Sequence, residues 1–325
     1  MDTLFLGVDG GNTKTIAMVA ERDGRIVGAG RAGTGDIYGA AGPAAAISEI
    51  TSAVERALAS AGPARRTVGW AAFSLAGADW PEDFEFLREA LASGPLLDAR
   101  IEIVNDAIGA LRAGTDDGIG VSVVCGTGDA IGARGPDGRI WHSSFWTRPS
   151  GGADELGRKA MRAILRAELT IGPPTTLTAR ALRHLDEPTV ENLLHAFTRR
   201  ERRRPFAELM GLAPVVLDEA EAGDRVAVSI VRRQGRRLAA YVRYAASAVG
   251  LRARPYPVVL AGGLFRHPSN VLAGELAHRI PDGRPHRAAF EPAVGALLLA
   301  FDAVGVSPDL ATLAPTLPPP HLFAT

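Results

Sequence analysis

The chain has 325 residues and a mass of 34.0 kDa, which is enough for two ordinary domains and too much for one small core. Hydrophobic residues make up 46% and charged residues 22%, which is the profile of a soluble globular protein. Lys plus Arg and Asp plus Glu both number 36, so the net charge of zero provides no overall field that would recruit nucleic acid or a membrane.

Strands and helices alternate in the first third of the chain. Apolar and β-branched runs predict strands at 4–8, 15–19, 68–75 and 101–104, and apolar residues at helical spacing predict helices at 43–61 and 81–91. A glycine turn, GGNT at 10–13, separates the first two strands, and RDGR at 22–25 turns the chain again. Alternation of this kind predicts a mainly α/β domain.

The next part of the chain echoes the first. Residues 119–125 form a second apolar strand, which leads into a second glycine turn, GTGD at 126–129, and then into PDGRI at 136–140. The first copy has the same order, from GVDGGNTKT at 7–15 to RDGRI at 22–26. Two copies predict a duplicated domain, because a repeat array needs more than two. The alternative is a chance similarity between two glycine-bounded hairpins.

Beyond residue 150 the pattern becomes mainly helical. Apolar residues at intervals of three and four predict helices at 154–168, 175–185, 189–199 and 224–249. A buried strand at 257–260 ends in AGG at 261–263, and residues 292–304 are apolar nearly all round, which predicts a helix packed deep between layers. The segment from Pro315 is predicted to be an extended surface strap. We place the domains at 1–114 and 115–325, with the helix near 291–305 packing back on the first domain.

Two glycine turns that each follow a buried strand suggest a phosphate cradle. Glycines let backbone amides approach an anion closely, and successive amides form an anion-binding concavity. The ammonium of Lys14 and the hydroxyls of Thr13, Thr15 and Thr127 would add donors. For either turn alone, an ordinary hairpin turn is the alternative. The first turn is not a P-loop, because the second glycine before Lys14 is missing, and GAGRAG at 28–33 leads into no helix that could hold a dinucleotide.

Two carboxylates follow strands at positions suited to phosphoryl transfer. Asp9 comes directly before the first glycine turn, where it could hold Mg²⁺ through water or serve as an Asx-turn residue. Asp106 follows strand 101–104 and begins a predicted helix, where an ionised carboxylate could act as general base for a substrate hydroxyl. Asn105 and Asp106 could instead be capping residues of that helix.

The sequence contains no motif for a histidine-ligated metal site, a serine hydrolase or a nucleic-acid-binding surface. The seven His residues show no metal-ligand spacing, and neither GxSxG nor HExxH occurs. The basic run RRERRR at 199–204 and the arginines at 232, 233, 236 and 237 are interpreted as solvated helix surface, because glutamates neighbour them and no aromatics interleave. The first residues have no basic stretch followed by a long apolar one, and no apolar run reaches membrane length. We expect a cytoplasmic protein with neither nucleic acid nor membrane as a partner.

Five motifs, in this order, make the sequence resemble the BadF/BadG/BcrA/BcrD ATPase family, the group that contains N-acetylglucosamine kinase. The motifs are GVDGGNTKT at 7–15, FSLAGADWPED at 73–83, VNDA at 104–107, VVCGTGD at 123–129 and VVLAGGLF at 258–265. The resemblance covers nearly the whole chain. It implies an α/β fold with two duplicated ribonuclease H-like (actin-like ATPase) domains around a central nucleotide cleft.

The resemblance also implies roles for individual residues. Asp9 would hold Mg²⁺ through water, and Asp106 would be the catalytic base. The residues implied to bind ATP are Gly10, Gly11, Asn12, Thr13, Lys14, Gly126, Thr127, Gly128, Gly262 and Gly263. The residues implied to bind the sugar are Asp36, Gly77, Asp79, Asn105, Asp106, Asp129 and Asp154.

Three positions depart from the family's pattern. The common GTGSN reads GTGDA here, so Asp129 and Ala130 replace residues that help to recognise an acetamido sugar. An asparagine after the early glycine-rich loop is replaced by Gly35 or Asp36. The sugar-binding aspartate of the family's GDEGS turn falls on Pro149 in an alignment without gaps and on Asp154 in an alignment with a gap.

We therefore expect an ATP- and Mg²⁺-dependent kinase that phosphorylates a hexose, above all an amino sugar such as N-acetylglucosamine or glucosamine, and that forms a homodimer. One alternative is an activator that couples ATP hydrolysis to electron transfer through a cluster shared between subunits. Such a cluster needs about two thiolates per subunit, and Cys125 is the single cysteine. A further alternative is an ATP-binding regulatory module without catalysis.

Overall fold

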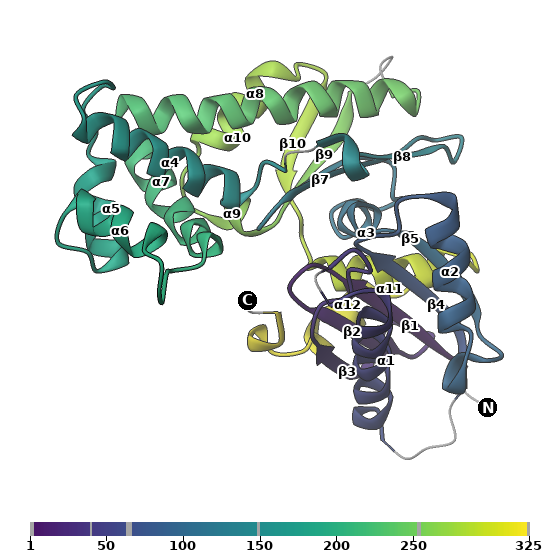
Figure 1. The fold of residues 1–325 in the computed structure, drawn as a ribbon. Coiled ribbons are helices and arrows are strands. Elements are labelled where there is room, and N and C mark those ends of the chain that lie inside the picture. Colours follow the sequence, from purple (N-terminus) through teal and green to yellow (C-terminus); the bar gives the residue numbers. More distant parts are fainter. Residues whose placement is uncertain (1–2, 40, 63–66, 148–149, 252–254, 324–325) are drawn as a thin grey trace.

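The protein folds into two lobes with a cleft between them. The computed structural model describes residues 3–39, 41–62, 67–147, 150–251 and 255–323. The first lobe contains the N-terminal strands together with the last long helix of the chain, and the second lobe contains the helical middle of the chain (Figure 1). None of the helices in these ranges combines the length and apolar character needed to cross a membrane.

A mixed five-stranded sheet forms the first lobe. Its strands are β1 (Thr3–Gly10), β2 (Thr15–Ala20), β3 (Ile26–Ala32), β4 (Thr67–Leu75) and β5 (Arg100–Asn105). They lie in the order β3-β2-β1-β4-β5, with β1 antiparallel to β2 and parallel to β4. Helix α1 (Pro43–Ser60) packs on β2 and β3, and α2 (Pro81–Leu91) packs near β5. The segment GAGRAG at 28–33 mostly forms β3, so it opens no nucleotide-binding helix.

The second lobe repeats this sheet. Its strands are β6 (Gly120–Cys125), β7 (Asp129–Arg134), β8 (Ile140–His142), β9 (Tyr256–Ala261) and β10 (Gly283–Arg287). Their order is β10-β9-β6-β7-β8, with β6 antiparallel to β7 and parallel to β9. Read from the other edge, this is the order and direction of the first sheet. The expected fold, with two ribonuclease H-like halves made by duplication, is therefore confirmed.

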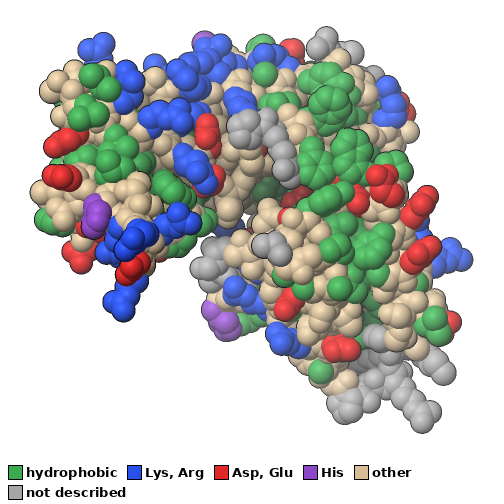
Figure 2. All heavy atoms as spheres, viewed as in Figure 1, with side chains coloured by type: hydrophobic (Ala, Val, Ile, Leu, Met, Phe, Trp, Pro, Cys, Tyr) green, Lys and Arg blue, Asp and Glu red, His purple; other side chains and the backbone are tan. Residues whose placement is uncertain are grey.

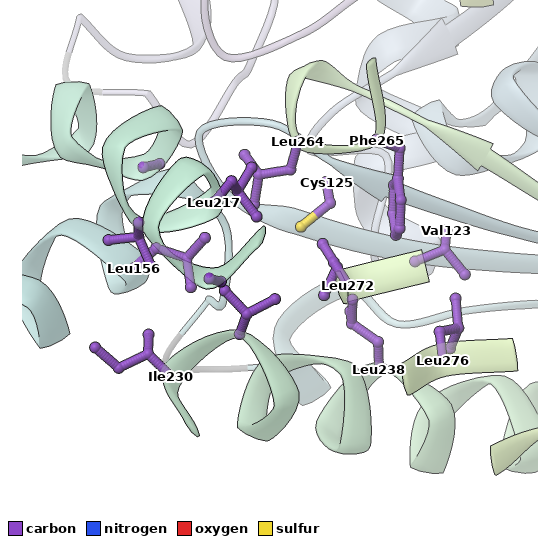
Figure 3. Close-up of a cluster of buried hydrophobic side chains, with 14 of the residues drawn as sticks. Val123, Cys125, Leu156, Leu217, Ile230, Leu238, Leu264, Phe265, Leu272 and Leu276 are labelled. Atoms are coloured by element: carbon purple, nitrogen blue, oxygen red, sulfur yellow. The ribbon is translucent and has the colours of Figure 1, made fainter. Parts of the chain in front are cut away.

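Helices between β8 and β9 enlarge the second lobe. They are α4 (Ala153–Glu168), α5 (Leu177–Leu185), α6 (Val190–Thr198), α7 (Leu212–Glu221) and α8 (Arg225–Ala248), and α9 (Gly263–Arg266) and α10 (Val271–Arg279) follow β9. The predicted helices agree with this part of the chain to within two residues. The buried stripe of α8, which includes Ile230 and Leu238, packs with α10 over the second sheet (Figure 3). Lys and Arg side chains gather on the visible face of this helical part (Figure 2).

Two helices cross where the lobes meet. Helix α3 (Asp106–Arg112) leaves the first sheet but packs on the second, where the Ser122 hydroxyl donates a hydrogen bond of 2.6 Å to the Ala107 carbonyl. Helix α11 (Pro292–Asp302) leaves the second sheet but packs on the first, where the rings of Phe5 and Phe301 stack at 4.1 Å. Helix α11 therefore completes the core of the first lobe, where Ile108 of α3 joins it, and α3 lies against strands of both sheets.

Two predictions about surface segments were wrong. The segment from Pro315 is not extended: the short turns η4 (Ala314–Thr316) and η5 (Pro320–Phe323) follow α12 (Leu310–Leu313) and curl against the first lobe, where Leu317, Leu322 and Phe323 pack on the core. The basic run at 199–204 lies between α6 and η3 (Phe206–Gly211), and not on the surface of a helix. Local composition identified both segments as polar or irregular but could not show what they contact.

The crossing of α3 and α11 predicts which glycine substitution the fold cannot accept. A Cβ atom on Gly295 would lie 1.9 Å from the backbone oxygen of Gly109, so Gly295→Ala should lower the free energy of unfolding by about 1–3 kcal/mol. Gly274 is the matched control, because it is also the fourth residue of a helix but a Cβ atom there would meet nothing within 4 Å. Gly274→Ala should leave stability unchanged or add up to about 1 kcal/mol. Denaturant unfolding measures both, and equal effects would contradict the prediction.

Candidate functional site

The candidate site lies where the parallel strands of both sheets end. Gly10 pairs with Leu75 and Leu75 pairs with Asn105, so β1, β4 and β5 end side by side. In the second sheet, Val124 pairs with Ala261, so β6 and β9 end side by side as well. The carboxyl ends of parallel strands are the usual location of ligand sites in α/β folds. All five family-like motifs reach this edge of one sheet or the other.

The first glycine turn is anchored by its backbone. The Gly11 amide donates to the Lys14 carbonyl at 2.9 Å, and the Gly10 carbonyl accepts from the Ala76 amide at 2.7 Å. Asn12 and Thr13 are exposed at the tip. The Lys14 ammonium donates to the backbone carbonyl of Phe323, so the turn η5 contacts the outer side of this loop. The turn is therefore held in place while its tip stays accessible to an anion.

The second glycine turn is held by the start of α4. The Gly126 amide donates to the Gly128 carbonyl at 2.9 Å. The Gly126 and Thr127 carbonyls accept from the amides of Ala153 and Asp154 at 2.8 and 3.3 Å. These contacts satisfy the first amides of α4 and direct two carbonyls of the turn toward that helix.

The structure places Asp154 away from the proposed sugar site. Its carboxylate pairs with Arg158 one turn along α4, at 2.8 Å from Nε, and it does not line the hollow between the lobes. Pro149, the other position for the family's aspartate, lies outside the described residues.

A hollow of about 160 Å³ lies between the lobes and is lined by both of them. The first lobe contributes Asn12, Asp36, Tyr38, Ala76, Gly77, Asp79, Asn105 and Asp106. The second lobe contributes Asp129, Ala130, Ser144, Phe145, Thr147 and Ser150. Apart from Asp154, every residue that the sequence implied for sugar binding lines this hollow. Asn12 of the first glycine turn lines it as well, so residues implied to bind the sugar and a residue implied to bind ATP face the same space.

Asn105 organises the floor of the hollow. Its side-chain oxygen accepts from the Ala107 amide at 3.2 Å and so caps α3, while its side-chain nitrogen donates to Asp79 at 3.0 Å. The capping role considered from the sequence is therefore present, and the same side chain also fixes a carboxylate. Asp36 is held on the opposite side by the Tyr38 amide, 2.9 Å from its Oδ1.

The carboxyls of Asp106 and Asp9 are unusually basic. Burial and the negative charges of Asp79 and Asp36, opposed in part by backbone amides, raise the pKa of Asp106 to about 7. Burial also raises the pKa of Asp9 to about 7, helped by the charges of Asp106 and Glu291 and opposed by Lys14. A carboxyl with a pKa near 7 can accept a proton from a hydroxyl at neutral pH, as a general base must.

Side chains of α8 bind the carboxylate of Asp129. Its carboxylate is fully covered and accepts from Arg237 Nη1 at 3.1 Å, from Gln234 Nε2 at 3.3 Å and from the Ser150 hydroxyl at 3.2 Å. Asp129 therefore fixes the wall of the hollow, and its carboxylate is already engaged by the protein. The interpretation of Arg237 as solvated helix surface was wrong. The spacing of Arg237 in the sequence could have indicated a buried position, because Arg237 lies three residues after Gln234 and beside Leu238 on the buried stripe of α8.

A second hollow of about 260 Å³ lies beside the glycines that follow β9. It is lined by Gly262, Phe265, Arg266 and Glu291, and by Phe323 of η5. Gly262 has a φ of +90°, and a Cβ atom there would lie 2.5 Å from the Cys125 carbonyl, so only glycine lets this turn lie on the end of β6. Gly263 begins α9 beside it. Of these two glycines implied to bind ATP, Gly262 thus lines the hollow and lies against Cys125, which directly precedes the second glycine turn.

Cys125 is not available for a shared metal cluster. Its side chain is fully buried between Leu264, Phe265 and Leu272, in the core of the second lobe (Figure 3). Burial strongly raises the pKa of its thiol, so the thiolate that a cluster requires is disfavoured. This geometry argues against the activator alternative.

The charge around Asp9 fits a hydrated divalent cation. Asp9 is a hard oxygen donor whose pKa is raised first by burial and then by the negative charges of Asp106 and Glu291, and a cation would stabilise its ionised form. Within the ranges that the structure describes, no three His, Cys, Asp or Glu side chains converge as ligands of one metal ion. Mg²⁺ commonly keeps several waters and binds through one or two carboxylates and substrate phosphates, so a single aspartate suits it.

Comparisons with known proteins identify a matching family and named relatives. The model of the BadF/BadG/BcrA/BcrD ATPase family matches residues 6–300. The chain is similar to an N-acetyl-D-glucosamine kinase of Dictyostelium discoideum, with 24% identity over 92% of this chain and 98% of the relative. It is also similar to an N-acetylmuramic acid/N-acetylglucosamine kinase of Clostridium acetobutylicum, with 24% identity over 81% of this chain and 85% of the relative.

Solved structures share the fold. A candidate N-acetylglucosamine kinase of Chromobacterium violaceum has a TM-score of 0.69 and 25% identity, over 92% of this chain and 99% of that one. A ROK family glucokinase of Streptomyces griseus has a TM-score of 0.56 and 19% identity, again over 92% and 99%. The second likeness concerns the fold alone. The relatives support a carbohydrate kinase as the general class of activity.

The raised pKa of Asp106 predicts a pH-dependent effect of Asp106→Asn on the protein without ligands. Between about pH 4 and pH 7 the folded state keeps a proton that the unfolded state has lost, so this residue makes the wild type less stable as pH rises through that window. Asparagine carries no charge, so the variant avoids this loss of stability. At pH 8 the variant should be more stable than the wild type by at most about 4 kcal/mol, and the difference should vanish near pH 4. Thermal unfolding at a series of pH values without Mg²⁺ tests this, and a variant that is less stable at pH 8 would contradict it.

Proposed function

Because the chain belongs to the BadF/BadG/BcrA/BcrD ATPase family, we propose that it is an ATP-dependent sugar kinase. The observation that carries the proposal is the hollow between the lobes, where Asn12 of the first glycine turn and Asp106 line the same space. A γ-phosphate held at the glycine turns would lie next to a hydroxyl held at Asp106. Phosphoryl transfer needs this alignment more than it needs covalent help from the protein.

The reaction follows from these positions. The substrate hydroxyl oxygen bonds to the γ-phosphorus, the bond from that phosphorus to the β–γ bridging oxygen breaks, and ADP leaves. The hydroxyl proton passes to the carboxylate of Asp106. Backbone amides of the two glycine turns bind the phosphates and stabilise the negative charge on the transferring group. The lobes exclude water, which would otherwise compete with the sugar hydroxyl for the phosphate.

Asp9 would hold Mg²⁺ through water beside the first glycine turn. The ion, when bound, would supply charge neutralisation for the triphosphate. The protein's own part is to present a hard oxygen donor at the end of β1, near Lys14, whose positive charge lowers the pKa of Asp9. ATP and Mg²⁺ are thus the nucleotide and metal that this site is proposed to use.

The proposed acceptor is an amino sugar, N-acetylglucosamine or glucosamine. The named relatives act on N-acetylated sugars, which supports this choice for a chain about a quarter identical to them. The hollow offers Asp36, Asp79 and Asn105 as hydrogen-bonding partners for ring hydroxyls. The covered carboxylate of Asp129 leaves the second lobe with Ser144 and Ser150 as hydroxyl groups at the same hollow.

A sugar panel tests the proposal. Thermal unfolding is measured with a non-hydrolysable ATP analogue, Mg²⁺ and each of glucosamine, N-acetylglucosamine, N-acetylmuramic acid, glucose and mannose. A true ligand stabilises the folded protein by mass action, so one amino sugar should raise the melting temperature and should also trigger ADP release from ATP. Stabilisation by ATP with no response to any sugar would favour the regulatory module instead.

Asp106→Asn should abolish sugar-dependent ADP release while ATP binding persists. General bases contribute about 100- to 10,000-fold, so kcat should fall by at least about 100-fold. The Kd for an ATP analogue should stay within about twofold, because the phosphate contacts come from other residues. Asp98→Asn, which removes an exposed carboxylate of the same lobe, serves as the control and should keep full activity. Undiminished turnover of the Asp106 variant would remove the base assignment.

A further inference from the structure

Three aromatic rings meet at the edge of the hollow between the lobes. Phe145 of η2 (Ser144–Thr147) comes from the second lobe, and Tyr38 and Trp80 come from the first. The rings of Phe145 and Tyr38 meet edge to face at 5.1 Å, and the rings of Phe145 and Trp80 are parallel at 6.0 Å. Both geometries are favourable for aromatic pairs. Phe145 thus joins the two lobes on the side where the substrate hollow lies.

One carboxylate fixes both rings of the first lobe. The Tyr38 hydroxyl donates to the two oxygens of Asp83 at 3.0 and 3.1 Å, and the Trp80 amide donates to Asp83 at 2.8 Å. Burial and the bond to Asp83 raise the pKa of Tyr38 to about 12, so its hydroxyl remains a donor at neutral pH. The two rings are therefore preorganised for the contact with Phe145.

Helix α8 fixes the segment that carries Phe145. Arg237 donates to the Thr147 carbonyl, and the Tyr241 hydroxyl donates to the Trp146 carbonyl at 2.7 Å. The same Arg237 binds Asp129, so one side chain positions both η2 and the start of β7. Phe145 is thus attached to the body of the second lobe and would move with it.

The contact is placed to open and close. Tyr38 and Trp80 keep 48% and 42% of their surface exposed, unlike the fully buried rings of Phe5 and Phe301 where the helices cross. Tyr38 and Phe145 also line the hollow, so a sugar bound there would pack against two members of the contact. Sugar binding and lobe closure would then favour each other through the same rings.

We propose that Phe145 is a positioning residue that latches the two lobes over the substrate hollow. In phosphoryl transfer, the latch would hold the sugar against Asp106 and keep water from the γ-phosphate. This part of the proposal rests on the proposed function. Phe145 contacts Tyr38 and Trp80 across the lobes, and two further pairs, Phe84 with His142 and Glu102 with Arg134, also join the lobes.

Kinetics of Phe145→Ala test the role in transfer. The KM for the sugar should rise by about 10-fold, equivalent to about 1.4 kcal/mol, and ATP hydrolysis without sugar phosphorylation should become a larger share of ADP release. The KM for ATP should stay within about twofold, since the ring does not line the hollow beside Gly262. Phe145→Tyr should restore the sugar KM because it keeps the ring.

Trp146→Ala is the matched control. Trp146 is adjacent in the same turn but is 69% exposed, and its contact with Tyr241 uses a backbone carbonyl that the substitution keeps. The control should behave as the wild type in both kinetic readouts. If the Phe145 and Trp146 variants have the same sugar KM and the same share of uncoupled hydrolysis, the role in transfer is overturned.

Small-angle X-ray scattering of the free proteins tests the latch without relying on kinase activity. Phe145→Ala should increase the radius of gyration relative to the wild type, whereas Trp146→Ala and Phe145→Tyr should not. An unchanged radius for Phe145→Ala overturns the latch even if sugar is phosphorylated. A wild type that phosphorylates no sugar overturns the proposed function and the role in transfer, while the scattering result still decides whether the rings hold the lobes together.

Discussion

The crossing of α3 and α11 is the constraint on which the rest of the structure depends. Each helix leaves one sheet and packs on the other, and their backbones approach so closely at Gly109 and Gly295 that no side chain fits between them. Arg112 and Asp302 add a bidentate ion pair, at 2.7 and 3.0 Å, between the ends of the two helices. Because the helices begin where the strands end, this crossing brings the strand-end turns of both lobes to one cleft.

The convergence of strand ends explains the electrostatics of the site. Asp9 lies at the end of β1 and Asp106 follows β5, with β4 between the two strands, and Asp36 and Asp79 lie in loops at the same edge, so burial and mutual repulsion raise the pKa of Asp9 and Asp106. Folding tolerates this cost because the core elsewhere is extensive. Asp129 belongs to the same cluster in space, but Arg237 compensates its charge. Asp129 therefore has a structural role in the wall of the hollow. The carboxyls of Asp9 and Asp106, with their raised pKa values, thereby lie where a cation and a hydroxyl are proposed to bind.

Much of this could be predicted from the sequence because it is local. Apolar periodicity located most of the strands and helices but not β8 or β10, and glycine turns after buried strands located the two candidate phosphate loops. Recurrence of the same strand–turn–strand order predicted the duplication, which the matching strand orders confirm. The resemblance to the family implied Asp36, Asp79, Asn105 and Asp106 as sugar-binding residues, and the structure brings all four into one hollow.

Other features were decided only by the tertiary structure, because they depend on partners far away in the chain. Asp129 and Arg237 are 108 residues apart, and only the packing of α8 on the second sheet makes them a pair. Asp154 has the right residue type for sugar binding, yet the orientation of α4 pairs its carboxylate with Arg158. Phe145 looks like an ordinary loop aromatic until the lobes are placed together. Sequence patterns report period and turn chemistry, whereas the partner of a side chain is set by how whole elements pack.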